Sequence, residues 1–82
     1  MNDETPVFLQ YQRLKLQHPG EILFFRLGDF YEMFDEQADE VSKLLNLTLT
    51  HRAEHHMCGI PYHACKIYIA RLLRLGKKVT IA

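Results

Sequence analysis

The sequence has few of the features that mark secreted or membrane-bound proteins. Its 82 residues include only two cysteines, Cys58 and Cys65. Two are too few for a disulfide scaffold, so we expect both to be thiols in a reducing compartment. No apolar run approaches the roughly 20 residues of a membrane span, and the first residues lack the basic and apolar regions of a signal peptide. We therefore expect a cytoplasmic chain with no membrane partner.

A net charge is also missing, because ten basic residues balance ten acidic ones. The bulk electrostatics therefore favour no anionic partner. The charges are nevertheless segregated: six acidic and no basic residues lie between Asp29 and Glu40, and five basic and no acidic residues lie between Lys66 and Lys78. Either a phosphate-bearing partner approaches the basic segment, or the two segments are solvated helix faces that attract each other.

Motifs that bind nucleotide phosphates or activate a nucleophile do not occur. The sequence contains no GxxxxGK[ST], GxGxxG, GxSxG or HExxH pattern, so we expect a non-catalytic chain that needs no cofactor. Repeats, low-complexity stretches and linkers are absent as well. With 48% hydrophobic and 24% charged residues, the composition is typical of a globular protein and predicts a single domain over residues 1–82.

Hydrophobic periodicity predicts an α+β domain, in which a small mixed sheet is packed by helices. The expected elements are helices over 6–17, from Asp35 to 45 and from 61 or 62 to 75, and strands over 21–27, 30–34, 47–50 and 79–81. Asp35 is the expected N-cap of the second helix, and Asn46 is expected to end it in the left-handed conformation. The predicted order is α-β-β-α-β-α-β, with residues 51–57 as a loop and the last strand cut short.

A predicted hairpin places an aromatic ring and a carboxylate side by side. Gly28 and Asp29 form the expected turn, and the period of two puts Phe30, Glu32 and Phe34 on one face of the second strand. Taken from the residues alone, Phe30 is a core residue and Glu32 an edge-strand charge. The functional alternative makes Phe30 a protruding wedge that stacks on a nucleic-acid base, with Glu32 as a hydrogen-bond acceptor beside it.

Histidines and cysteines gather within fifteen residues of the chain. The group consists of His51, His55, His56, Cys58, His63 and Cys65. Only His51 and His55 have a spacing that zinc sites use, while the six-residue separation of the two cysteines does not fit. We therefore interpret the group as loop histidines and small buried thiols, and expect no metal site. A nucleophilic Cys58 paired with His63 lacks a third, orienting group.

Three blocks carry a resemblance to a known family. Gln10–Lys15, Gly28–Phe34 and Gly59–Ala64 occur in the order and at the spacing typical of the N-terminal mismatch-recognition domain of the MutS family of DNA mismatch repair proteins, which the chain resembles from residue 5 to residue 82. The resemblance implies that Phe30 stacks on a mispaired or unpaired base from the minor groove and that Glu32 hydrogen-bonds the base. Near DNA the pKa of Glu32 should rise, so that it shares a proton with a base nitrogen.

The resemblance extends to further residues and partners. Arg52 and Lys66 are candidates for contacts with the DNA backbone, with simple solvation as the alternative. Gly59–Ala64 is expected to pack the third helix and shape the neighbouring loop. The implied partners are double-stranded DNA with mismatches or small loops, the remainder of a MutS-like protein and its dimer partner, on the nucleoid.

Two departures from the family pattern leave the length of the protein open. The family's domain continues beyond the position of Ala82, and the ATPase, lever and clamp regions are absent, so ATP and magnesium are implied only for a full-length relative. The chain is either a piece of a larger protein or a shortened homologue. Two other classes of function remain as alternatives: a protein-interaction adaptor that retains the fold, and a small metal-dependent nuclease that uses residues 51–63.

Overall fold

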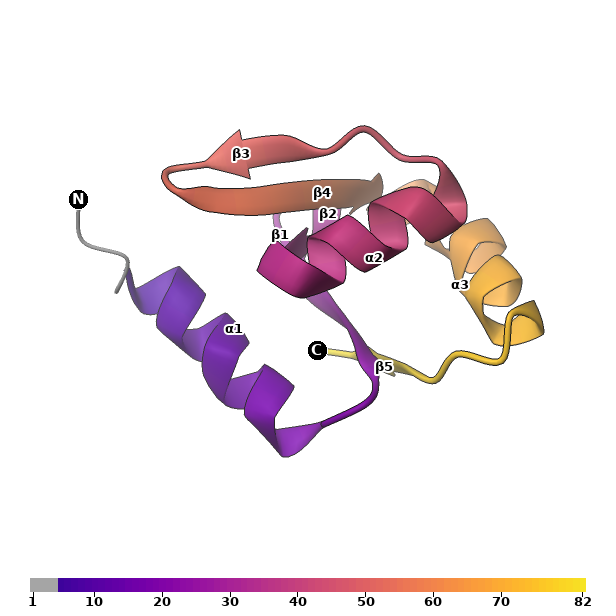
Figure 1. Ribbon diagram of the computed structural model, residues 1–82, viewed down its shortest axis with the longest axis horizontal. Coiled ribbons are helices and arrows are strands. Elements are labelled where there is room, and N and C mark those ends of the chain that lie inside the picture. The colour runs from indigo at the N-terminus through magenta and orange to yellow at the C-terminus, as the bar shows by residue number, and fades with distance from the viewer. Residues whose placement is uncertain (1–4) are drawn as a thin grey trace.

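A five-stranded mixed sheet forms the centre of the domain, with helices packed against it (Figure 1). The computed structural model describes residues 5–82. In chain order the elements are α1 (Pro6–Gln17), β1 (Ile22–Leu27), β2 (Phe30–Phe34), α2 (Asp35–Leu45), β3 (Thr50–Arg52), β4 (His55–Pro61), the 3₁₀ helix η1 (Tyr62–Ala64), α3 (Cys65–Arg74) and β5 (Val79–Ile81). The strand order is β3-β4-β2-β1-β5; β5 pairs with β1 in parallel and the other pairs are antiparallel. The predicted α+β class with a small mixed sheet is confirmed.

Side chains along each strand point alternately to the two faces of the sheet, and the apolar ones form two separate cores, one on each face. The larger core lies under α2 and α3 and consists of Ile22, Phe24, Tyr31, Met33, Ala38, Val41, Leu45, Cys58, Ile60 and Leu72. The smaller core lies under α1 and consists of Phe8, Tyr11, Leu23, Phe25 and Phe34. Among residues 5–82, α1 is the helix whose residues contribute to the smaller core.

The predicted first helix is confirmed at both ends. Thr5 is its N-cap, and the hydroxyl of Thr5 accepts a hydrogen bond of 3.2 Å from the backbone N–H of Phe8. Pro6 follows at the first helical position, where a missing N–H costs nothing. The rings of Phe8 and Tyr11 both pack on Phe34, which fixes α1 to β2.

The second helix has the predicted extent but not the predicted cap. Asn46 ends it at φ 57°, as expected. The N-cap, however, is Phe34, and Asp35 is the first helical residue, at φ 54°. The carboxylate of Asp35 lies 3.0 Å from Nδ1 of His55 on β4, so it is engaged in a tertiary contact rather than in capping.

The segment between α2 and α3 departs from the prediction. Residues 47–49 are not in a strand, and the expected loop over 51–57 is a β-hairpin of β3 and β4 whose turn contains Ala53 at φ 56°. β4 lies between β2 and β3 and is a central strand. The sequence did not indicate this strand, because two polar histidines begin it and interrupt the alternation of apolar and polar residues. The structure shows that those histidines are paired with carboxylates, which lets them lie in a strand.

The last part of the chain follows the prediction closely. A 3₁₀ turn over Tyr62–Ala64 leads into α3, whose Leu72 is completely buried and whose Cys65, Tyr68 and Ile69 pack on the larger core. Gly76 follows the helix at φ 80°, as its expected role at the C-terminus requires. β5 then aligns with Ile22–Phe24 of β1.

Candidate functional site

The end of β2 next to the turn carries the one phenylalanine that is not buried. Phe30 is 44% exposed, whereas the other four phenylalanines of the chain are at most 7% exposed. Phe30 pairs with Leu27 of β1 and Pro61 of β4, and it belongs to neither of the two cores. The interpretation of Phe30 as a core residue is therefore wrong, and its ring is available to a partner.

Glu32 lies on the same face, two residues further into the sheet. It pairs with Phe25 on β1 and Gly59 on β4, so it occupies a central position of the sheet rather than an edge. Its Oε1 atom is buried and has no hydrogen-bond partner among the described residues. Burial raises the pKa of Glu32, and the positive charge of Arg52 opposes this shift with a smaller effect.

Gly59 provides the space that the Glu32 carboxyl group occupies. A Cβ atom at position 59 would lie 2.7 Å from Oε1 of Glu32, which is closer than real side chains approach. Sequence reasoning assigned the block that begins at Gly59 to packing of the third helix and so missed this relation. An isolated glycine within a strand is the signal that indicates such a close approach, but no strand had been predicted over His55–Pro61.

The two other candidate DNA-contacting residues lie on opposite sides of the sheet. Arg52, on the edge strand β3, is close enough to act electrostatically on Glu32, so the structure brings these two residues together. Lys66 is exposed on α3, which packs on the other face. Contact of either residue with DNA remains a prediction.

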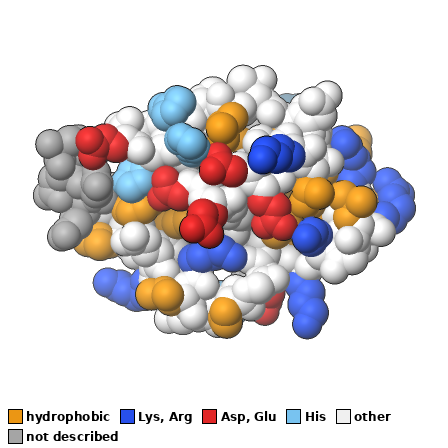
Figure 2. All heavy atoms as spheres, in the orientation of Figure 1, with side chains coloured by type: hydrophobic (Ala, Val, Ile, Leu, Met, Phe, Trp, Pro, Cys, Tyr) orange, Lys and Arg blue, Asp and Glu red, His pale blue; other side chains and the backbone are white. Residues whose placement is uncertain are grey.

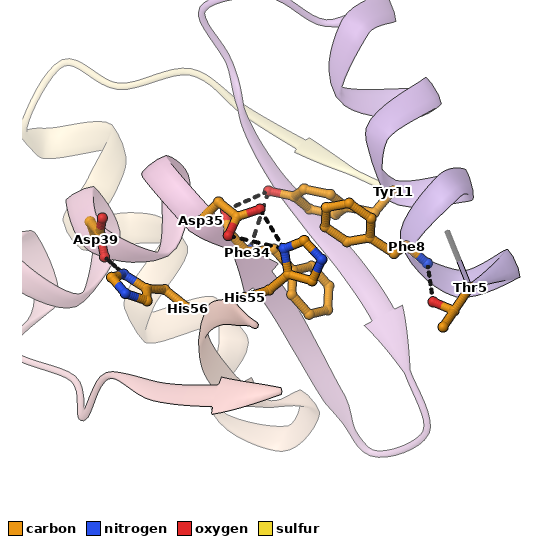
Figure 3. A network of polar contacts seen from close by, with 8 residues as sticks. All are labelled: Thr5, Phe8, Tyr11, Phe34, Asp35, Asp39, His55 and His56. Carbon is orange, nitrogen blue, oxygen red and sulfur yellow. Dashed lines mark hydrogen bonds and ion pairs between the residues drawn. The ribbon is translucent and has the colours of Figure 1, made fainter. Parts of the chain in front are cut away.

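The histidines at the start of β4 tie the sheet to α1 and α2 (Figure 3). His55 contacts Asp35 and stacks on Phe8 with ring centroids 3.7 Å apart, and Nδ1 of His56 lies 2.7 Å from the carboxylate of Asp39. Across residues 5–82, no three His, Cys, Asp or Glu side chains converge in a way that would hold a metal ion. Burial raises the pKa of the Cys58 thiol to about 11, so it is a poor nucleophile at neutral pH. These contacts give His55 and His56 a structural role.

The segregated charges of the sequence also have a structural explanation. Figure 2 shows acidic side chains gathered over α2 and basic side chains at the end of the molecule that α3 occupies. Lys77, just after α3, forms an ion pair of 3.1 Å with Glu40 of α2. This pair supports the interpretation of the two segments as solvated helix faces that attract each other.

Comparison with known proteins assigns the family. The family model of MutS domain I matches residues 5–82. The chain belongs to the MutS domain I family. It is 65% identical over 78 residues to the DNA mismatch repair protein MutS of Treponema denticola, and 56% identical over 78 residues to the MutS proteins of two strains of Treponema pallidum, one of which is strain Nichols. Each alignment covers 95% of this chain but 9% of the relative.

In this MutS domain I, the exposed ring of Phe30 and the carboxyl group of Glu32, whose buried Oε1 has no hydrogen-bond partner among the described residues, lie on the same face of the sheet. The described part of the chain contains no helix long and apolar enough to cross a membrane.

Proposed function

We propose that this MutS domain I detects mispaired or unpaired bases in double-stranded DNA by inserting Phe30 from the minor groove. The observation that carries the proposal is the exposure of Phe30 on the same face of the sheet as the buried Oε1 of Glu32, which has no hydrogen-bond partner among the described residues. The names of the relatives, which are DNA mismatch repair proteins, support the same function. Such a domain would act on the nucleoid in the cytoplasm.

The physical basis of discrimination is the mechanical weakness of a mismatched step. Inserting a ring between stacked bases costs a few kcal/mol per step, and this cost is smallest where pairing is already lost. Phe30 would therefore enter a mismatched duplex more readily than a perfect one, whatever the surrounding sequence. Stacking on a base contributes about 1–3 kcal/mol, which offsets the deformation only at weak steps.

Glu32 would contact the base that Phe30 displaces. An ionised carboxylate is repelled by DNA phosphates, but burial already raises the pKa of Glu32 in the free protein. The approach of phosphates raises it further, since a nearby negative charge favours the protonated form. The protonated Oε1 can then donate to a base nitrogen, so the group without a partner in the free domain gains one in the complex.

The remaining binding energy would come from outside the domain. The chain carries no net charge, and few phosphate contacts give weak affinity and a shallow dependence on salt. We expect the 82 residues to bind duplex DNA in the high-micromolar to millimolar range, on the order of non-specific affinity or weaker. Further DNA contacts would come from the rest of a MutS-like protein, where ATP and magnesium would bind, and from its dimer partner. This domain would add contacts from Arg52 and Lys66.

The test is an NMR titration, which tolerates weak binding. The ¹⁵N-labelled chain is titrated with a hairpin duplex that contains an unpaired thymine and with the matched duplex. We expect tighter binding to the first duplex, and loss of this preference in Phe30→Ala. Leu16→Ala is the control, since Leu16 is an 82% exposed apolar residue on α1 and its truncation should change nothing.

Equal binding of both duplexes that salt abolishes and that Phe30→Ala leaves unchanged would contradict mismatch detection. That result would favour the protein-interaction adaptor, in which Phe30 would contact a partner protein instead of DNA.

A further inference from the structure

The turn that carries Phe30 is held by the side chain of Arg26 and the backbone of Tyr62, two residues that the sequence analysis did not connect with Phe30. Arg26, on β1, lies opposite Tyr31 of β2, and these two residues point to the face opposite Phe30. The guanidinium carbon of Arg26 lies 3.6 Å from the centroid of the Tyr62 ring and 5.8 Å from that of Tyr31. Tyr62 begins the 3₁₀ helix that follows β4, so the stack joins two segments that are far apart in sequence.

Both carbonyl groups of the turn are bound by this pair. Nε of Arg26 donates a hydrogen bond to the carbonyl of Gly28. The backbone N–H of Tyr62 donates to the carbonyl of Asp29 over 2.8 Å. Gly28 has a φ of 59°, which suits glycine and leaves the turn with little intrinsic rigidity. The orientation of the turn, and with it the direction of Phe30, therefore depends on contacts from Arg26 and Tyr62.

We propose that Arg26 and Tyr62 are positioning residues that hold the Gly28–Asp29 turn so that Phe30 projects in the orientation needed for insertion. This inference rests on the proposed function of Phe30. A wedge that pivots on a loose turn would lose part of its binding energy in ordering the turn at each encounter. A wedge that is already oriented binds the duplex without this loss. A loose turn would therefore weaken the complex in which Phe30 is inserted, but it would not weaken DNA contacts that do not involve Phe30.

Conservative variants separate this role from a phosphate contact and from a merely structural one. Arg26→Lys keeps the positive charge but loses the planar group that stacks on Tyr62 and donates from Nε. Tyr62→Leu removes the ring, and Tyr62→Phe keeps it. Arg26 is exposed and Tyr62 is 48% exposed, so the variants should retain the fold, which thermal melting checks.

Two readouts are measured on the 82-residue chain. The first is the hydrogen-exchange rate of the Tyr62 amide in the free protein, which reports on its bond to Asp29. The second is the ratio of affinities for the duplex with an unpaired thymine and the matched duplex. A cation–π contact at an exposed site changes a population ratio by about two- to fivefold. We therefore expect Arg26→Lys and Tyr62→Leu to accelerate exchange and to reduce the affinity ratio by about that factor, and Tyr62→Phe to match the wild type.

The outcomes distinguish this proposal from the proposed function. Unchanged exchange in both Arg26→Lys and Tyr62→Leu overturns it, as does faster exchange with an undiminished affinity ratio. If Arg26→Lys behaves as wild type while Arg26→Gln weakens both duplexes equally, Arg26 is a phosphate contact and the positioning role is refuted. A wild-type chain with no preference for the unpaired base refutes the proposed function, and the exchange measurement still decides whether the two residues hold the turn.

Discussion

Replacing Gly59 with alanine tests the link between the sheet and the Glu32 carboxyl group. The new Cβ would lie 2.7 Å from Oε1, 3.2 Å from Cδ and 3.3 Å from Oε2 of Glu32, while ordinary contact begins at 3.4 Å. The carboxyl group must therefore move by about 0.7 Å, the difference between 3.4 and 2.7 Å. Because the obstacle is the end of a flexible side chain, Glu32 can move while the strand stays in place.

The expected change in stability is small, although the site changes. Gly59 has no positive φ, so alanine fits its backbone and should stabilise the chain by about 0.4–1 kcal/mol through the unfolded state. A displaced Glu32 rotamer costs about 0.5–1.5 kcal/mol, which cancels this gain. The free energy of unfolding should therefore change by less than about 1 kcal/mol. The displaced carboxyl group becomes more hydrated, so its pKa should fall toward the ordinary value.

The assay is a ¹³C-detected NMR titration of the Glu32 carboxyl carbon, combined with urea denaturation. Glu32→Ala supplies the matched background, because Gly59→Ala made in that variant meets no carboxyl group and should show only the stabilising backbone effect. A Glu32 pKa that is the same with glycine or alanine at position 59 would refute the reasoning, and so would equal effects of Gly59→Ala on stability in the two backgrounds.

Three further predictions concern single contacts. Burial raises the pKa of Glu32 in the folded chain, so the folded state favours the protonated carboxyl group. The free energy of unfolding is therefore highest below the ordinary carboxyl pKa and falls as the pH rises through the raised value. Glu32→Gln should thus gain stability over wild type as the pH rises through that window, while mismatched and matched duplexes become harder to distinguish; a stability difference that is independent of pH, or unchanged discrimination, would contradict this. Gln37→Leu should destabilise the fold by about 1–3 kcal/mol for each group left unsatisfied, since the Gln37 amide accepts from the N–H and donates to the carbonyl of Leu23 over 2.9 and 2.7 Å; urea denaturation measures the loss, and a change below about 0.5 kcal/mol would be evidence against a buried bond. Leu72→Ala should cost about 2–5 kcal/mol, because Leu72 is the completely buried anchor of α3, whereas Ile67→Ala on the exposed side of the same helix should cost little; similar losses for the two variants would show that the core does not hold α3 through Leu72.

The sequence predicted the features that depend on only one or two neighbouring residues. The Thr5–Pro6 start of α1, the turn at Gly28 and the left-handed Asn46 each depend on the conformational preference of one or two residues, and the structure has all three where they were expected. The fold class follows from the order of such elements.

Elements that depend on tertiary partners were not predictable in the same way. β4 begins with two histidines, which have no apolar alternation to reveal a strand, and their partners Asp35 and Asp39 come from α2. Asp35 was assigned to a cap for the same reason, because its actual partner lies 20 residues further along the chain. Gln37 shows the limit most clearly, since nothing in an isolated helix indicates that its side chain completes the hydrogen bonding of β1.

The candidate site was found through its resemblance to a family and not through its physical pattern, and the structure explains why. A phenylalanine in a β-rich hairpin is ordinarily buried, whereas Phe30 is 44% exposed and belongs to neither core. The glutamate beside it lies over Gly59 with a buried oxygen that has no partner among residues 5–82, an arrangement that folding alone would disfavour. Such departures concentrate where function requires them.

Phe30 and Glu32 lie two residues apart on one strand, and substituting either of them should weaken function without lowering stability. Removing the ring of Phe30 should leave the fold intact, because the ring belongs to neither core. Replacing the carboxyl group of Glu32 with an amide should stabilise the fold at neutral pH, because it removes the cost of a partly buried charge. Both changes should weaken the distinction between mismatched and matched DNA. Structural residues such as Leu72 behave differently, since their loss would lower stability and function together. Measuring both quantities for the same variants therefore separates the residues that detect the mismatch from those that only hold the domain in shape.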